Sequence, residues 1–145
     1  MQSVIVVGLD GSLESRRAAL WTARQASLTS SRVIVVHAID SPVYAGYGQF
    51  TQGWIPPGLT DAQRNSIRAE VHDCWAEPLA KASVDFDVVI GEGPPAAVIR
   101  EIADNEHADL IVVGRRGRGG FAELIMGSTS HQLTHHAARP LAVIP

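Results

Sequence analysis

The sequence predicts a single, doubly wound α/β domain over residues 1–145, with five parallel strands and helices on both faces of the sheet. Three observations predict this fold. Five short runs are rich in valine and isoleucine, segments of helical character separate them, and three of the runs contain a stretch that is apolar at every position. Alternating strands and helices are typical of a parallel sheet, and strands that are apolar on both sides are covered on both faces. Such a fold is Rossmann-like.

The expected strands are the valine- and isoleucine-rich runs, which glycine, proline or charged residues bound on each side. They comprise residues 3–8, 32–38, 84–91, 108–114 and 140–145. Within them, the stretches 4–7, 33–36 and 110–113 are apolar throughout. We therefore expect these three stretches to be buried between helices.

Three of the expected helices have clear starting signals. Residues 13–28 are rich in alanine and follow Ser12, whose hydroxyl can cap the first turn. Residues 94–106 open with two prolines, which a first helical turn tolerates. Residues 128–138 follow a glycine and open with three hydroxyl residues. With the remaining helix, the order of elements is βαβαβαβαβ.

The remaining helix is expected over residues 61–77, beginning after Thr60. Cys74 falls on the helical spacing of its apolar residues, so we expect it to face the core as a small buried side chain. Pro78 is expected to end or kink this helix, because proline cannot donate a backbone hydrogen bond.

Composition excludes several classes of protein. The formal net charge of −3 argues against a general nucleic-acid binder. Cys74 is the only cysteine, so neither an intrachain disulfide nor a cysteine-based zinc site can form. No run approaches the roughly 18 apolar residues of a membrane span, and the amino end has no basic leader. We expect a soluble, cytoplasmic protein without membrane or nucleic-acid partners.

One segment has no clear periodicity. Residues 41–59 contain four glycines, three prolines and four aromatic residues. A loop of this length within a compact domain is usually functional or disordered. Its aromatic residues could form a lid or a partner surface, and a mobile loop is an equal alternative.

Ligands of doubly wound folds bind at the carboxyl ends of the strands, where the strand order reverses. The loops expected there are GLDGS, residues 8–12, and GRRGRGGFAELIMGSTS, residues 114–130. Glycines allow backbone amides to approach an anion, and Gly127 with Ser128 would begin a helix whose amino end favours negative charge. Three arginines and three hydroxyl residues in the longer loop add donors for phosphate. The alternative is a flexible turn with solvated arginines.

Two common phosphate-binding motifs are missing from the sequence. A Walker A loop ends in Gly-Lys-Ser or Gly-Lys-Thr, but Ser128 follows Met126 and Gly127, and the only lysine is Lys81. The dinucleotide pattern G-x-G-x-x-G is not present after the first strand. The sequence therefore supports neither a standard nucleoside triphosphatase nor a NAD enzyme.

The spacing Gly114-x2-Gly117-x9-Gly127-Ser128 resembles the ATP-binding motif of the universal stress protein family. The resemblance extends along nearly the whole chain, through VVGLDGS, VVHAID, ADLIVVG and ARPLAVIP. It implies the strand order 3-2-1-4-5, which would bring the two glycine-containing loops face to face. It also implies a homodimer formed through the last strand, residues 140–145.

The resemblance also implies which residues bind the nucleotide. Asp10 would contact the ribose or the adenine amine, and Ala38 would contact adenine through its backbone. Gly8 and Leu9 would form the floor. The phosphate cradle would comprise Gly114, Gly117, Gly127, Ser128 and Thr129, with Val113, Arg115, Arg118 and Ser130 completing the predicted site. Arg115 departs from the family, which often has serine or threonine there, so the preferred number of phosphates stays open.

Other candidate residues have simpler interpretations. His131 and His135 are four residues apart on one helix, but HQLTHH contains no acidic residue, so we favour an exposed polar face over a metal site. His37 is expected to shape the mouth of the pocket or to pack there. Ser12 lacks the G-x-S-x-G context of a nucleophile and is expected to cap a helix.

We predict a regulatory protein that binds ATP, with or without Mg²⁺, and acts as a sensor and not as an efficient catalyst. One alternative is a slow ATPase or an adenylate-transferring enzyme on the same fold. Another is a nucleotide-free interaction module. A response-regulator receiver is disfavoured, because Ile90 and Gly91 occupy the place of its phospho-acceptor aspartate.

Overall fold

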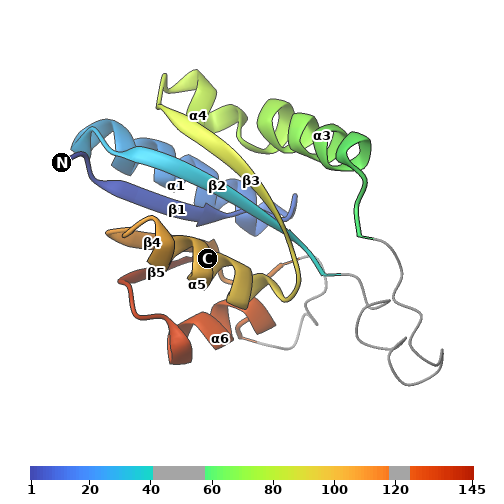
Figure 1. The fold of residues 1–145 in the computed structure, drawn as a ribbon. Helices are drawn as coiled ribbons and strands as arrows, with labels where there is room; N and C mark the ends of the chain where they lie inside the picture. The colour runs from blue at the N-terminus through green and yellow to red at the C-terminus, as the bar shows by residue number, and fades with distance from the viewer. Residues whose placement is uncertain (41–57, 118–124) are drawn as a thin grey trace.

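A computed structural model describes residues 1–40, 58–117 and 125–145 and contains one sheet in the order β3-β2-β1-β4-β5 (Figure 1). All neighbouring strands pair in parallel. The strands are β1 (Val4–Gly8), β2 (Arg32–Ile39), β3 (Phe86–Glu92), β4 (Leu110–Gly114) and β5 (Leu141–Ile144). The predicted fold class and strand order are therefore confirmed. Because the chain adds β2 and β3 on one side of β1 and β4 and β5 on the other, the direction of winding reverses between β1 and β4.

Helices cover both faces of the sheet. They are α1 (Leu13–Thr29), α3 (Asp61–Glu70), α4 (Glu77–Lys81), α5 (Pro95–Asn105) and α6 (Ser128–His136), with a π-helical turn η2 (Val71–Trp75) between α3 and α4. One hydrophobic core cluster lies between one face of the sheet and α1, η2 and α4. A second lies between the other face and α5 and α6. Figure 1 shows α1 behind the sheet and α5 in front of it. In the described ranges, no helix combines the length and apolarity needed to cross a membrane.

The three fully apolar stretches form the centre of the sheet, as predicted. Val6, Val7, Val33, Val35 and Val112 are all completely buried. Side chains of neighbouring residues point to opposite faces of a strand. The apolar residues of these strands therefore fill both cores.

Helix α1 begins as the sequence predicts. Ser12 lies in extended conformation, and its Oγ accepts a hydrogen bond from the Ser15 amide at 3.1 Å. The helix buries Ala18, Ala19 and Ala23 against the sheet. Small side chains allow it to approach the strands closely.

The predicted helix over residues 61–77 is not continuous. It changes to a π-helical turn at Val71, in which the Ala76 amide donates to the Val71 carbonyl oxygen at 2.8 Å. The wider turn lets Val71 and Ala76 both reach the core, where each is completely buried. It also rotates Cys74 outward, so the prediction of a buried cysteine is wrong: Cys74 is exposed. Pro78 lies in the first turn of α4, just after the break.

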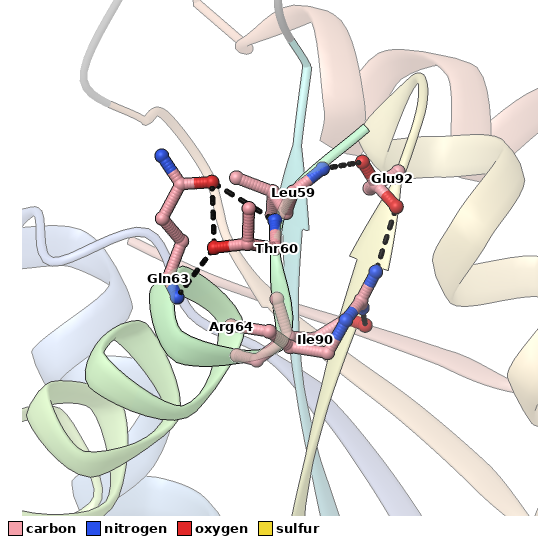
Figure 2. A network of polar contacts seen from close by, with 6 residues as sticks. All are labelled: Leu59, Thr60, Gln63, Arg64, Ile90 and Glu92. Carbon is pink, nitrogen blue, oxygen red and sulfur yellow. Dashed lines mark hydrogen bonds and ion pairs between the residues drawn. The ribbon is translucent and has the colours of Figure 1, made fainter. Parts of the chain in front are cut away.

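A polar network joins the start of α3 to the end of β3 (Figure 2). Thr60 and Gln63 form a reciprocal capping box. Arg64 donates to the Ile90 carbonyl oxygen at 2.6 Å and to Glu92 Oε2 at 2.7 Å, while Glu92 Oε1 accepts from the Leu59 amide at 3.0 Å. These contacts fix where α3 begins relative to the carboxyl end of the sheet.

Candidate functional site

A cavity of about 620 Å³ opens at the carboxyl ends of β1, β2 and β4. Its size is within the roughly 300 to 1,000 Å³ typical of ligand pockets. It lies where the winding reverses, which is the expected ligand position in a doubly wound fold. The lining residues are Gly8, Leu9, Asp10, Ser15, Val36, His37, Ala38, Asp40, Trp75, Pro95, Ile99, Val113, Gly114, Arg115, Arg116, Gly117, Gly127, Ser128, Thr129 and Ser130.

The structure brings the predicted binding residues together. Every one that falls in residues 1–40, 58–117 or 125–145 lines this cavity. Arg118 lies outside the described residues, as do the neighbouring Gly119 and Gly120 and most of the 41–59 segment. The sequence did not single out Ser15, Asp40, Trp75, Pro95 or Ile99 as site residues, although all five reach the cavity.

One end of the cavity is the amino end of α6. Gly127 precedes the helix in extended conformation, with φ −73° and ψ 167°, and no side chain caps the first turn. The amides of Ser128, Thr129 and Ser130 belong to that turn, which offers them no acceptor within the helix. The helix dipole adds partial positive charge. This end of the cavity is therefore suited to an anion.

Backbone contacts hold the two ends of the glycine-rich segment together. The Arg115 amide donates to the Ile144 carbonyl oxygen at 2.7 Å, which ties the segment to β5. The Arg115 carbonyl oxygen accepts from the Gly127 amide at 2.7 Å and from Ser130 Oγ at 2.6 Å. Ser130 is buried, and its hydroxyl proton is shared between the Arg115 carbonyl oxygen and the Gly127 carbonyl oxygen, which lies 3.1 Å from Oγ. It therefore positions the loop, while Ser128 and Thr129 lie at the start of the helix with more exposed side chains.

Asp10 connects the loops that follow β1 and β4. Its Oδ1 accepts a hydrogen bond from the Ser12 amide at 2.9 Å. Its Oδ2 lies against Gly117, where an added Cβ atom would overlap the carboxylate oxygen. The carboxylate can occupy this place only because residue 117 has no side chain.

Two arginines add positive charge beside the cradle. Arg115 and Arg116 both line the cavity and are partly buried. Arg116 lies 3.8 Å from Glu14 Oε1, measured from its Nη2. The buried Nε of Arg115 meets no hydrogen-bond acceptor among the described residues. A buried donor of this kind favours an acceptor such as a phosphate oxygen.

The opposite end of the cavity is formed by the end of β2 and by Trp75. His37 Nδ1 lies 2.8 Å from the Leu9 carbonyl oxygen. Because a carbonyl can only accept, Nδ1 carries the proton in this contact. The expectation that His37 shapes the mouth of the pocket is confirmed by its position. The sequence did not predict Trp75 as a site residue, because a regular helix over 61–77 gives no reason to direct this side chain toward β2.

Two histidines of α6 contact each other, as their spacing of four residues predicts. The rings of His131 and His135 lie edge to face, with centroids 4.7 Å apart. Within the described parts of the chain, no group of three or more His, Cys, Asp or Glu side chains is placed to hold a metal ion.

The fold and the cavity define a doubly wound α/β protein whose cavity lies at the point of strand reversal, beside the amino end of α6. The chain belongs to the universal stress protein family, whose model matches residues 1–145. A universal stress protein of Thermus aquaticus is 33% identical over 146 residues and covers 99% of both chains. One of Mycobacterium tuberculosis is 32% identical over 147 residues, covering 99% of this chain and 48% of its own length. The chain thus spans about half the length of the first curated relatives that it matches.

Solved structures of the family share the fold. UspA from Lactobacillus plantarum aligns with a TM-score of 0.76 at 19% identity, covering 99% of this chain and 97% of its own. A universal stress protein in complex with cAMP aligns with a TM-score of 0.69 at 22% identity, covering 99% and 96%. One from Archaeoglobus fulgidus in complex with dAMP aligns with a TM-score of 0.67 at 21% identity, covering 100% and 98%. At these identities the likeness concerns the fold.

Proposed function

We propose that this protein binds ATP in the cavity at the carboxyl ends of the strands and acts as a regulatory protein of the cytoplasm. The observation that carries the proposal is the amino end of α6, which no side chain of the described residues caps and which faces the turn after β4. The complexes of two structural neighbours with cAMP and dAMP support an adenine nucleotide as the ligand. A single, unpaired cysteine favours the reducing cytoplasm.

In this proposal, each part of the cavity binds a different part of the nucleotide. The first-turn amides of α6 and the hydroxyls of Ser128 and Thr129 bind the phosphates. Arg115 supplies charge and a buried Nε donor that meets no acceptor among the described residues, which favours a polyphosphate over a single phosphate. Asp10 accepts from ribose hydroxyls, because a carboxylate would repel the phosphates but can accept hydrogen bonds. The backbone of Ala38 contacts the base.

We expect Mg²⁺ to bind at this site only together with the nucleotide. The described residues supply no set of three metal-binding side chains. Magnesium commonly keeps several waters and binds through substrate phosphates. We therefore expect the phosphate oxygens and water to hold most of its coordination positions.

The lining supports binding more than catalysis. Phosphoryl transfer requires an oriented nucleophile and cations that stabilise the transferring group. Asp10 already accepts from the Ser12 amide, and the only lysine, Lys81, pairs with Glu77 on α4 at 2.8 Å. We propose that ATP changes the interactions of this protein and that turnover is slow or absent.

The test begins with protein purified without added nucleotide and then denatured, so that any released ligand can be identified by chromatography. Nucleotide-free protein is titrated calorimetrically with ATP, ADP and AMP. We expect one ATP per chain, with weaker binding as phosphates are removed, because Arg115 and the α6 amides lose partners. No heat of binding with any of the three nucleotides would overturn the proposal. Steady phosphate release that disappears in Asp10→Ala would indicate an enzyme instead.

We also propose a homodimer formed through residues 140–145. Strand β5 is the outer strand of the sheet beside β4, and its four residues are only partly buried. An apolar edge that is left unpaired promotes association with another strand. Light scattering of the purified protein should give twice the mass of the chain. Replacing Val143 with lysine should shift the mass toward that of the monomer, because charge on an edge strand opposes pairing. Val143 also packs against the core, so thermal unfolding must show that the variant is folded. A monomer at tens of micromolar would exclude this interface.

A further inference from the structure

The proposed function requires a subsite for the nucleobase, and the selection of the base described below rests on that function. The phosphate cradle lies at β4 and α6, on one side of β1, while β2 lies on the other side. A nucleotide that reaches from the cradle across Asp10 therefore places its base over the end of β2. His37, Ala38 and Trp75 line the cavity there.

Trp75 reaches this position through the π-helical turn. The contact between the Ala76 amide and the Val71 carbonyl oxygen spans five residues, where an α-helix would span four. Single π-turns of this kind occur frequently at functional sites. Val71 and Ala76 are anchored in the core on each side of the turn, so the position of Trp75 between them is well defined.

The indole ring of Trp75 is partly buried and packs against His37. Its centroid lies 4.8 Å from that of the His37 ring, and the ring planes are 87° apart. His37 is itself fixed by the 2.8 Å contact between its Nδ1 and the Leu9 carbonyl oxygen. Edge-to-face geometry is a favoured arrangement of two aromatic rings. Trp75 therefore places an aromatic side chain in the wall of the cavity.

The opposite layer of helices supplies a second apolar wall. Pro95 and Ile99 of α5 line the same cavity, whereas Trp75 packs with the core on the other side of the sheet. We propose that Trp75 is a specificity-determining residue whose ring forms the aromatic wall of the nucleobase subsite and favours a purine. A two-ring base covers more of an indole surface than a one-ring base does, and base stacking on aromatic side chains is a general source of affinity.

The experiment compares Trp75→Leu, Trp75→Phe and the control Trp21→Phe, which changes a tryptophan of α1 that does not line the cavity. Each protein is titrated calorimetrically with ATP and CTP, and inorganic tripolyphosphate is tested as a competitor. We expect Trp75→Leu to weaken ATP binding roughly tenfold, the effect of losing one stacking contact. The affinity for CTP should fall much less than the affinity for ATP. Tripolyphosphate should compete with ATP as well as it does in the unchanged protein. Trp75→Phe should retain most of the ATP affinity, and Trp21→Phe all of it.

The outcomes separate this inference from the proposed function. Failure of the unchanged protein to bind ATP overturns the proposed function, and the inference with it. Normal ATP binding with equal affinity in Trp75→Leu overturns the inference alone. Parallel loss of ATP and tripolyphosphate binding in Trp75→Leu also overturns it, because Trp75 would then act only through the packing of the fold.

Discussion

Replacing Gly117 with alanine is expected to weaken ATP binding by on the order of 10- to 100-fold, which corresponds to about 1.4 to 2.8 kcal/mol of binding free energy. The added Cβ atom would overlap Asp10 Oδ2. Either the carboxylate moves and loses its 2.9 Å contact with the Ser12 amide, or the turn after β4 moves away from α6. Both movements disturb the part of the cavity that would hold ribose and phosphate. Calorimetric titration measures the effect directly.

Gly127→Ala is expected to weaken ATP binding less than Gly117→Ala does. Its added Cβ atom would lie 3.2 Å from the Arg116 Cα atom and 3.4 Å from the Arg115 carbonyl oxygen, which is tight without overlap. We therefore expect a smaller loss of ATP affinity than in Gly117→Ala. Unchanged ATP affinity in both variants would contradict the placement of the phosphates in this cradle.

A double variant tests the cause of the Gly117 effect. If the overlap with Asp10 is responsible, Asp10→Ala combined with Gly117→Ala should bind ATP as Asp10→Ala does, because the overlapping atom is gone. Fully additive losses would instead indicate that the alanine disturbs the turn by itself. Thermal unfolding of each variant shows whether the fold is intact.

Replacing Leu133 with alanine is expected to lower the free energy of unfolding by about 2 to 5 kcal/mol, the cost of truncating a buried leucine. Leu133 is 1% exposed and belongs to the core between α5, α6 and the sheet. Its removal leaves a cavity beneath the helix that begins at the phosphate cradle. Urea unfolding measured by circular dichroism gives the change.

The neighbouring residue provides a matched control for Leu133. Gln132 is exposed on the same helix, so Gln132→Ala should change the free energy of unfolding by less than about 0.5 kcal/mol. Saturating ATP should raise the stability of both variants, because a ligand that binds only the folded state stabilises it. A loss below 1 kcal/mol in Leu133→Ala would contradict the buried position of this side chain.

The strands and most helices were predictable because their signals are local. Residues 4–7, 33–36 and 110–113 are apolar at every position, and only strands covered on both faces require this. Ser12 and Thr60 are capping residues whose effect extends over one helical turn. The structure confirms the strands, and both capping contacts are present.

Two predictions for residues 61–77 were wrong: the helix is not continuous, and Cys74 is not buried. In both cases the packing of the core overrides the helical pattern of the sequence. An α-helical pattern directs Cys74 inward, but the core accepts Val71 and Ala76 together, and this requires a wider turn. The same turn moves Trp75 into the cavity. No spacing rule in the sequence signals this change, because it depends on the surface against which the helix packs.

The sequence by itself determined the alternation of strands and helices, the glycine spacing after β4 and the lack of a second cysteine for an intrachain disulfide, because each depends on residue type and local order. Only the tertiary structure decided that Asp10 fits against Gly117, that the Arg115 carbonyl oxygen is held by Gly127 and Ser130, and that Trp75 meets His37. These contacts join residues that are distant in the chain. Their geometry exists only after the strands are in register and the helices are packed on both faces.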